Sequence, residues 1–234
     1  MSLIVGTEPA LLEITEAEFF SEEALEGVFE LNQAVIAQLI AAVNRPASDV
    51  RPQPAVALGP TLLALGSAAR RYLSRCPVAL ADLEFRNIEW WRHLSQEKEP
   101  PAHHSSPGCF PHLPAMQLAQ TTLTLAWTLV GASRESAAVI FGLAPECATL
   151  LGKLGVPAIQ RVAEAYPHHL RLRWEMDTRF WRALLRIAQT AESPEQPRLP
   201  PIGTYALQRQ FSDLVSLPPA PATPETVPPR AIHR

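Results

Sequence analysis

Seven basic side chains are concentrated between residues 168 and 186, where only Glu175 and Asp177 are acidic. The seven are His168, His169, Arg171, Arg173, Arg179, Arg182 and Arg186. The permanently charged members are all arginines, whose planar guanidinium groups bind phosphates and base edges through paired hydrogen bonds. The cluster therefore predicts a DNA contact made mainly to phosphates. A solvated arginine face with local ion pairs is the alternative that the residues leave open.

The arginines are spaced for two kinds of element. Residues 168–174 alternate as in a strand, which would place Arg171 and Arg173 on one strand face. Residues 177–189 have helical spacing, so the three later arginines would share one helix face at i, i+3 and i+7. Further candidates for DNA contact lie in or beside a C-terminal segment: Arg198, Thr204 and Arg209.

A metal site is the other chemistry that the residue types allow, in the stretch HHSSPGCFPH at 103–112. Its possible zinc ligands are His103, His104, Cys109 and His112. Their spacing matches no standard site, and nothing indicates the second shell that would orient them. We therefore expect a linker here, with no metal and no cofactor.

Catalytic motifs are missing from the sequence. It contains no GxSxG, no Walker loop and no HExxH. Serine, histidine and acidic residues occur, but no recognisable motif positions a nucleophile beside a base. We therefore expect no catalytic residues and no enzyme activity.

The composition is that of a chain with a real core, held in one large domain or two small ones. Of its 234 residues 47% are hydrophobic, and 24 are prolines against 10 glycines. The prolines cluster at 46–60, 100–114, 194–201 and 218–229, which indicates linkers and a tail.

Charge is distributed unevenly along the chain. Residues 1–30 hold eight glutamates and no Lys or Arg, although the net charge of the whole chain is only −3. An acidic arm on a mildly basic body is typical of a regulator with an autoinhibitory or partner-docking arm. A merely solvated N-terminal segment is the open alternative.

The sequence signals favour a cytoplasmic protein. Three cysteines, with no CxxC, indicate neither a disulfide framework nor a four-cysteine zinc site. No apolar run reaches the length of a membrane span, and residues 1–30 lack the pattern of a signal peptide.

Hydrophobic spacing predicts a mainly α-helical fold. The clearest helix covers residues 22–43 and is ended by Asn44 and Arg45-Pro46, after which 47–60 form a proline-broken loop. Further helices are expected within 60–76, 87–97, 115–132, 133–143, 144–154, 155–166, 177–189 and 204–215. Ser133 and Asp177 are expected to cap helices, and 78–85 to be extended.

Two segments of the chain match each other. Trp91-Arg92-His93-Leu94 resembles Trp181-Arg182-Ala183-Leu184. Other matches pair Leu58-Gly59-Pro60 with Leu143-Ala144-Pro145, Leu65-Gly66 with Leu154-Gly155, and Leu83-Glu84-Phe85 with Leu172-Arg173-Trp174. The match between Leu58 and Leu143 lies 85 residues apart, and the other matches lie 89 or 90 residues apart. The pattern predicts a tandem repeat that forms a covalent pseudo-dimer.

Large aromatic residues are candidates for the interface between the repeats. They are Trp90, Trp91, Phe180 and Trp181. Each can bury on the order of 150–250 Å². The pairs could equally fill the core of their own repeat.

The second repeat resembles the FlhD family. The matching points are ESAAVIFGL, CATLLGKL, PAIQRVAEA and LRLRW, with a looser match over residues 202–215. In the first repeat VFELNQAVIAQLI resembles the family's opening helix, with Asn32 and Gln38 at the family's spacing. The first repeat lacks the family's second and C-terminal helices. The matches cover roughly residues 28–94 and 116–215.

This resemblance implies an all-α, DNA-binding subunit of a transcriptional activator of FlhDC type. An FlhC-like zinc-binding partner subunit, possible higher-order hetero-oligomers and control of flagellar or conjugative mobile-element genes are implied with it. Residues 144–154 and 156–166 fit a helix-turn-helix-like pair with its turn at Gly155. The alternative function is a helical protein-interaction adaptor or scaffold without DNA binding.

On this interpretation the chain has five parts. They are an acidic N-terminal arm (1–21), a degenerate FlhD-like repeat (22–97), a Pro/His/Ser linker (98–114), an FlhD-like repeat with a C-terminal helix (115–216) and a Pro-rich disordered tail (217–234).

Overall fold

The computed structural model describes residues 22–46, 49–96, 108–190 and 205–209. The described chain is predominantly helical, as the sequence predicted. The acidic arm, the tail, most of the linker and the candidates Arg198 and Thr204 lie outside the described residues. We call residues 22–96 the first half and residues 108–209 the second half.

The first half begins with the predicted long helix, α2 (Glu22–Val43), which has the expected bounds. It continues with α3 (Gln53–Ala57), α4 (Gly59–Leu63), α5 (Ser67–Ser74), β1 (Ala81–Asp82) and α6 (Ile88–Ser95). The predicted loop at 47–60 was wrong, because α3 and the start of α4 lie within it. Pro54 and Pro60 stand in the first turns of these helices, where a missing N–H costs no hydrogen bond.

The second half consists of α7 (His112–Ala132), α8 (Arg134–Phe141), α9 (Pro145–Leu151), α10 (Val156–Ala165), η1 (Pro167–His169), β2 (Arg171–Leu172) and α11 (Thr178–Thr190). Ser133 caps α8 as predicted, since its Oγ accepts a hydrogen bond from Ser136 N at 3.1 Å. Helix α7 begins at His112, so the last three residues of the predicted linker are helical.

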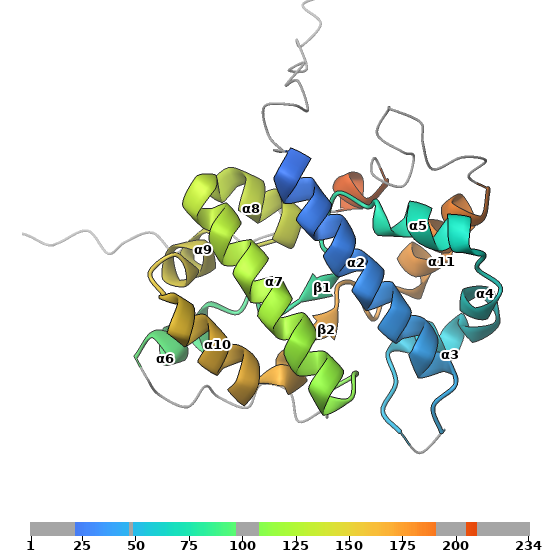
Figure 1. The fold of residues 1–234 in the computed structure, drawn as a ribbon, viewed down its shortest axis with the longest axis horizontal. Helices are drawn as coiled ribbons and strands as arrows, with labels where there is room; N and C mark the ends of the chain where they lie inside the picture. Colours follow the sequence, from blue (N-terminus) through green and yellow to red (C-terminus); the bar gives the residue numbers. More distant parts are fainter. Residues whose placement is uncertain (1–21, 47–48, 97–107, 191–204, 210–234) are drawn as a thin grey trace, which may run out of the picture.

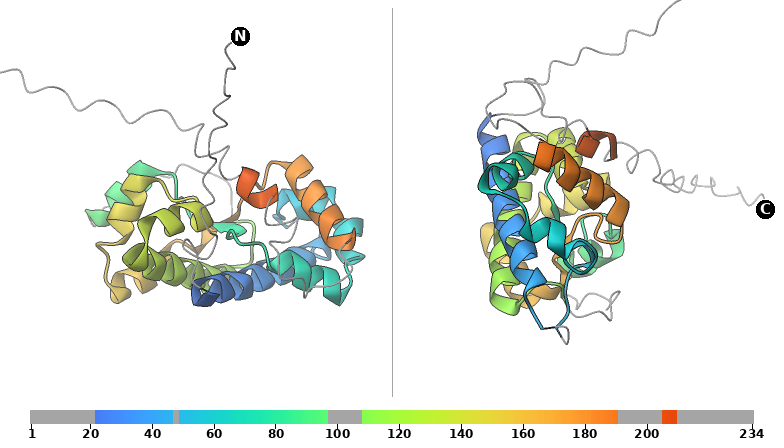
Figure 2. Two further views of the ribbon diagram at one scale, coloured as in Figure 1. Left: turned by 90° about the horizontal axis from the view of Figure 1, so that it is seen from above. Right: turned by 90° about the vertical axis from the view of Figure 1, so that its right-hand side faces the viewer.

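The long helices α2 and α7 lie side by side on one face of the molecule and pack on each other (Figures 1 and 2). The antiparallel strands β1 and β2 pair behind them. Helix α6 packs against α9 of the second half, whereas α11 packs against α3 and α5 of the first half. Helices α6 and α11 thus each contact the other half.

Both halves contribute to one continuous hydrophobic cluster. The largest fully buried side chains in it are aromatic: Trp90, Trp91, Trp181, Phe85, Phe141 and Phe180. Because aromatic side chains bury the most apolar area each, every one of these residues contributes more hydrophobic stabilisation than a smaller apolar side chain. In the described part of the chain, no helix combines the length and the apolar character that crossing a membrane requires.

The segments before α6 and α11 have the same local structure 90 residues apart. Glu84 (φ 54°) and Trp174 (φ 52°) both adopt the left-handed conformation that side chains disfavour. The Trp91 indole N–H donates to the Glu84 carbonyl at 2.9 Å, and the Trp181 indole N–H donates to the Trp174 carbonyl at 3.1 Å. The sequence match that paired Leu83-Glu84-Phe85 with Leu172-Arg173-Trp174 was therefore one residue out of register.

The β1–β2 pairing is self-complementary. Ala81 pairs with Leu172 and Asp82 pairs with Arg171. A shift of 90 residues exchanges the two strands and turns each of these pairs into the other. This is the pattern of an interface in which the same surface occurs on both partners.

The long helices also correspond, with a shift of 87 residues. All seven buried positions of α2 fall on buried positions of α7 under this shift: Val28, Leu31, Asn32, Val35, Ile36, Leu39 and Ala42 correspond to Ala115, Leu118, Ala119, Thr122, Leu123, Ala126 and Leu129. The two helices therefore present equivalent faces to the shared core.

Candidate nucleic-acid interface

Arg173 belongs to the core of the molecule. Its side chain is 8% exposed, and its guanidinium donates to the Ile140 carbonyl at 2.8 Å and to the Ala79 carbonyl at 3.4 Å. The guanidinium also lies over the Trp174 ring, 4.6 Å from its centroid. These contacts correct the expectation that Arg173 shares an exposed strand face with Arg171, because β2 ends at Leu172 and the chain turns at Trp174.

The two carboxylates of the basic segment are both paired with arginine. Arg171 Nη1 lies 3.7 Å from Glu175 Oε2, and burial, opposed by Arg171, raises the pKa of the Glu175 carboxyl. Arg209 Nη2 lies 3.4 Å from Asp177 Oδ2. The charges of Arg171 and Arg209 are therefore largely balanced by these neighbours.

His168 and His169 contribute little to an exposed basic face. Burial lowers the pKa of His168, and this favours its neutral form. His169 is buried, and its Nδ1 lies 3.2 Å from Glu84 Oε1 in the first half. Sequence spacing gave no signal for this buried pair, since the two residues are 85 positions apart.

Helix α11 carries the exposed basic face. Its three arginines, Arg179, Arg182 and Arg186, are exposed, whereas Phe180, Trp181, Leu184, Leu185 and Ala188 on the other side are buried. The helix contains no carboxylate. Within the described ranges, none of the three guanidinium groups forms an ion pair. No carboxylate of the described residues therefore neutralises this face.

The position of α11 is firmly defined. Asp177 Oδ1 caps the helix by accepting a hydrogen bond from Phe180 N at 2.9 Å, as predicted. The Phe180 ring packs against Trp174 at 4.4 Å and stacks on Tyr205 at 5.5 Å between centroids. The three arginines span about 10 Å along the helix, since each residue rises about 1.5 Å. That length covers about three phosphates of one DNA strand, which are spaced about 3.4 Å along the duplex axis.

The helix-turn-helix-like pair, α9 and α10, has a less basic surface. Lys153 and Arg161 are exposed, but Glu164 is exposed on the same helix as Arg161. Glu146 on α9 forms an ion pair with Arg92 at 2.9 Å. In the described structure the exposed surface of α11 is therefore more basic than that of α10.

The four aromatic residues predicted at the repeat interface have different surroundings. The Trp90 ring contacts two rings of the second half, Tyr166 at 5.9 Å and His169 at 5.2 Å between centroids. The recorded ring partners of Phe180 are Trp174, Trp181 and Tyr205, all in its own half. Trp90 thus makes ring contacts between the halves, whereas the ring contacts of Phe180 are all within the second half.

The stretch weighed as a metal site is only partly described. Cys109 is buried, and burial raises the pKa of its thiol to about 12. His112 is exposed at the start of α7, while His103 and His104 lie outside the described residues. Among the residues that the structure describes, no group of three His, Cys, Asp or Glu side chains is placed to hold a metal ion.

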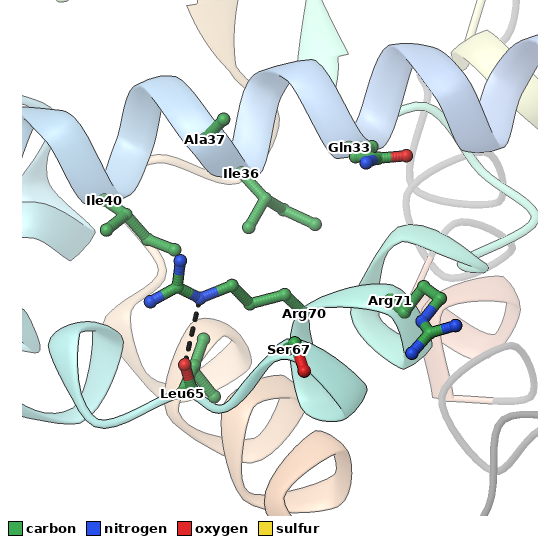
Figure 3. Close-up of a pocket in the computed structure, with 8 residues that line it drawn as sticks. All are labelled: Gln33, Ile36, Ala37, Ile40, Leu65, Ser67, Arg70 and Arg71. Atoms are coloured by element: carbon green, nitrogen blue, oxygen red, sulfur yellow. Dashed lines mark hydrogen bonds between the residues drawn. The ribbon is translucent and has the colours of Figure 1, made fainter.

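A groove between α2 and α5 was not anticipated from the sequence (Figure 3). It has a volume of about 560 Å³. It is lined by Gln33, Ile36, Ala37, Ile40, Leu65, Ser67, Arg70 and Arg71, which include two arginines and no carboxylate. Side chains from two helices form it, so helical spacing within either one could not reveal it.

Comparison of the chain with protein-family models, curated proteins and solved structures yields no match. Among the described residues, two surface features are candidates for a binding site: the arginine face of α11 and the groove beside α5. The first is suited to an extended anion such as a nucleic-acid backbone. The second is suited to an apolar segment that carries negative charge.

Proposed function

We propose that the chain is a DNA-binding subunit of a transcriptional activator of FlhDC type, acting in the cytoplasm without catalytic activity of its own. It would work with an FlhC-like zinc-binding partner subunit, in a hetero-oligomer, on flagellar or conjugative mobile-element genes. The observation that carries the proposal is the exposed, carboxylate-free arginine face of α11. The resemblance of the second half to FlhD supports it.

We also propose that the chain is a tandem FlhD-like repeat that forms a covalent pseudo-dimer. The left-handed residues and indole hydrogen bonds that recur at a shift of 90 residues support this architecture. The self-complementary β1–β2 pairing is further support. The fused repeats would give this subunit the arrangement that separate chains form in the family.

Within this proposal the DNA contact is made mainly by Arg179, Arg182 and Arg186. Arg171 and Arg209 would lie at the margin of the contact, because each is paired with a carboxylate. Arg198 and Thr204 stay predicted contacts outside the described residues. Arg173 is left out because it is buried. The FlhC-like partner would supply much of the base-specific contact.

The test is a DNA-binding measurement on the full chain co-purified with an FlhC-like partner. Fragments of genomic DNA are incubated with the complex, and the enriched fragments are sequenced. We expect selective enrichment that requires both chains and is lost in the triple variant Arg179→Ala, Arg182→Ala, Arg186→Ala. Circular dichroism and the yield of the complex establish that the variant is folded.

The matched control removes three positive charges from the other candidate surface. Arg134, Lys153 and Arg161 are exposed on or beside α8, α9 and α10, and the triple alanine variant of these residues should keep its DNA enrichment. If this control loses DNA binding and the α11 variant keeps it, the helix-turn-helix-like pair is the DNA-binding element and our assignment to α11 is wrong.

A protein-interaction adaptor is the second candidate function, and the groove between α2 and α5 favours it. An adaptor would form a stable complex with its partner and show no affinity for DNA at any salt concentration. A DNA-binding subunit loses affinity as salt rises, because each neutralised phosphate releases counterions. Binding of the complex to random duplex DNA over a range of salt concentrations therefore separates the two functions.

A further inference from the structure

The region of the second half that corresponds to the groove between α2 and α5 lies between α7 and α10, which pack on each other. The shift of 87 residues that aligns α2 with α7 makes Ile40 correspond to Trp127. A shift of 89 residues aligns the N-terminal caps of α5 and α10, Gly66 and Gly155, and makes Arg70 correspond to Ile159. Trp127 is half-buried and Ile159 is 3% exposed, whereas Arg70 is exposed. The second half therefore has a tryptophan and a buried isoleucine at the positions that Ile40 and the exposed Arg70 hold in the first half.

Two corresponding backbone carbonyls, one in each half, accept hydrogen bonds from different kinds of side chain. The Trp127 indole N–H donates to the Leu154 carbonyl at 2.8 Å. In the first half Ile40 has no donor, and Arg70 Nε donates to the equivalent carbonyl of Leu65 at 2.9 Å (Figure 3). In the first half Arg70 thus makes the hydrogen bond that Trp127 makes in the second. The apolar side chains of Ile36 and Leu65 line the groove beside it.

The charge at the rim of this groove is positive. Arg70 and Arg71 are both exposed, and none of the described residues that line the groove is a carboxylate. Arg71 forms no ion pair with any described residue. A segment that fits here must bring a bulky apolar side chain to the floor and negative charge to the rim.

We propose that the groove binds the acidic arm of the same chain, through residues 8–18. This segment, EPALLEITEAE, carries Leu11, Leu12 and Ile14 among four glutamates and has no positive charge apart from any chain terminus. Its apolar side chains replace in the first half what Trp127 supplies in the second. Its glutamates pair with Arg70 and Arg71. The inference does not depend on DNA binding.

The arm is long enough to reach. Gln33 and Ile40 lie about 17 and 27 Å along α2 from Glu22, at about 1.5 Å per residue. The nine residues from 13 to 21 span up to about 30 Å when extended, at about 3.3 Å per residue. Leu12 can therefore return along α2 to the groove, whereas Phe19 and Phe20 are too close to Glu22 to do so.

The test places the photoreactive amino acid benzoylphenylalanine at position 12 of the full chain. After irradiation, crosslinked peptides are identified by mass spectrometry. We expect crosslinks within one chain to residues 33–40 and 65–71. The substitution Ile40→Trp, which copies the second half, should fill the groove and reduce these crosslinks to background.

A second variant keeps the test decisive if Ile40→Trp disturbs folding. Arg71→Glu reverses one exposed charge, and it should lower the crosslink yield about fivefold at low salt, the effect of losing and repelling one exposed ion pair. Arg161→Glu makes the same charge change on α10 and should leave the yield unchanged. Crosslinks that map elsewhere, form only between chains, or ignore both groove variants would overturn the proposal.

Discussion

Helices α6 and α11 begin in the same way and present opposite surfaces. Each follows a left-handed residue, is capped by the side chain three residues later, and holds a tryptophan indole on that left-handed residue's carbonyl. The exposed positions that correspond at a shift of 90 residues are Glu89, Arg92 and Gln96 in the first half and Arg179, Arg182 and Arg186 in the second. The buried face is thus shared, and only the exposed face of α11 is basic.

This difference separates the buried residues, which the fold requires, from the exposed arginines, which a binding partner would require. Phe85, Trp90 and Trp91 in the first half and Phe180 and Trp181 in the second are all buried, because both helices must anchor in the shared core. Arg92 is neutralised by Glu146 at 2.9 Å, whereas the α11 arginines have no such neighbour among the described residues. The buried packing that both helices share therefore does not depend on the three exposed arginines of α11.

The largest expected effect comes from the two indoles that anchor these helices. Trp91→Ala and Trp181→Ala should each lower the free energy of unfolding by about 3–5 kcal/mol, because each removes a buried aromatic ring and a hydrogen bond. Urea unfolding followed by circular dichroism measures both. A cost below about 1 kcal/mol for one of them would show that the two anchors are not equivalent.

Substitution of Arg173 tests a second difference between the halves, which lies in the core. At a shift of 90 residues it corresponds to Leu83, which is buried and apolar. Arg173→Leu should lower the free energy of unfolding by about 2–3 kcal/mol, because the carbonyl of Ile140 loses its charged donor. The same urea titration gives the value. Unchanged stability combined with weakened DNA binding would instead place Arg173 in the DNA contact.

The helix caps should have smaller and similar effects. Asn87→Ala removes the bond to Trp90 N at 3.1 Å, and Asp177→Ala removes the bond to Phe180 N at 2.9 Å. Each substitution should cost about 1 kcal/mol of unfolding free energy. Asn87→Ser and Asp177→Asn, which keep a capping oxygen and add no negative charge, serve as controls and should cost less. A control as destabilising as its alanine variant would mean that capping is not the relevant contact.

The smallest effect concerns the ion pair on α6. Arg92→Ala should change the free energy of unfolding by less than about 0.5 kcal/mol, because both partners are about half exposed and solvent screens the pair. It should also leave DNA binding unaltered, in contrast to Arg182→Ala at the corresponding position of α11. A marked loss of DNA affinity for Arg92→Ala would bring the first half into the interface.

Much of the local structure could be predicted from the sequence. The regular apolar spacing of residues 22–43 gave α2 with its observed bounds, and Ser133 and Asp177 were identified as caps by their residue type. The short helix α3 was missed because the prolines of 46–60 were treated as helix breakers, although Pro54 in a first turn is compatible with a helix. Helix α4 was expected within 60–76 and begins one residue earlier, at Gly59.

The site was harder to predict because exposure depends on tertiary contacts. Arg173 and Arg179 have the same charge and are six residues apart, yet one donates to carbonyls of distant segments and the other is exposed. The groove beside α5 depends on Ile40 and Arg70, which come from different helices. The spacing of residues along one helix or strand indicates neither the burial of Arg173 nor the meeting of Ile40 and Arg70.

The central claim is that DNA is contacted by α11 and not by its counterpart α6. The most direct measurement is the slope of log affinity against log salt for the full chain with its FlhC-like partner on random duplex DNA. Replacing Arg179, Arg182 and Arg186 by alanine should reduce this slope by about 2.7, because about 0.9 counterion is released per phosphate neutralised. Replacing Glu89, Arg92 and Gln96 by alanine should leave the slope unchanged. Equal slopes for the wild type and the α11 variant would contradict the account.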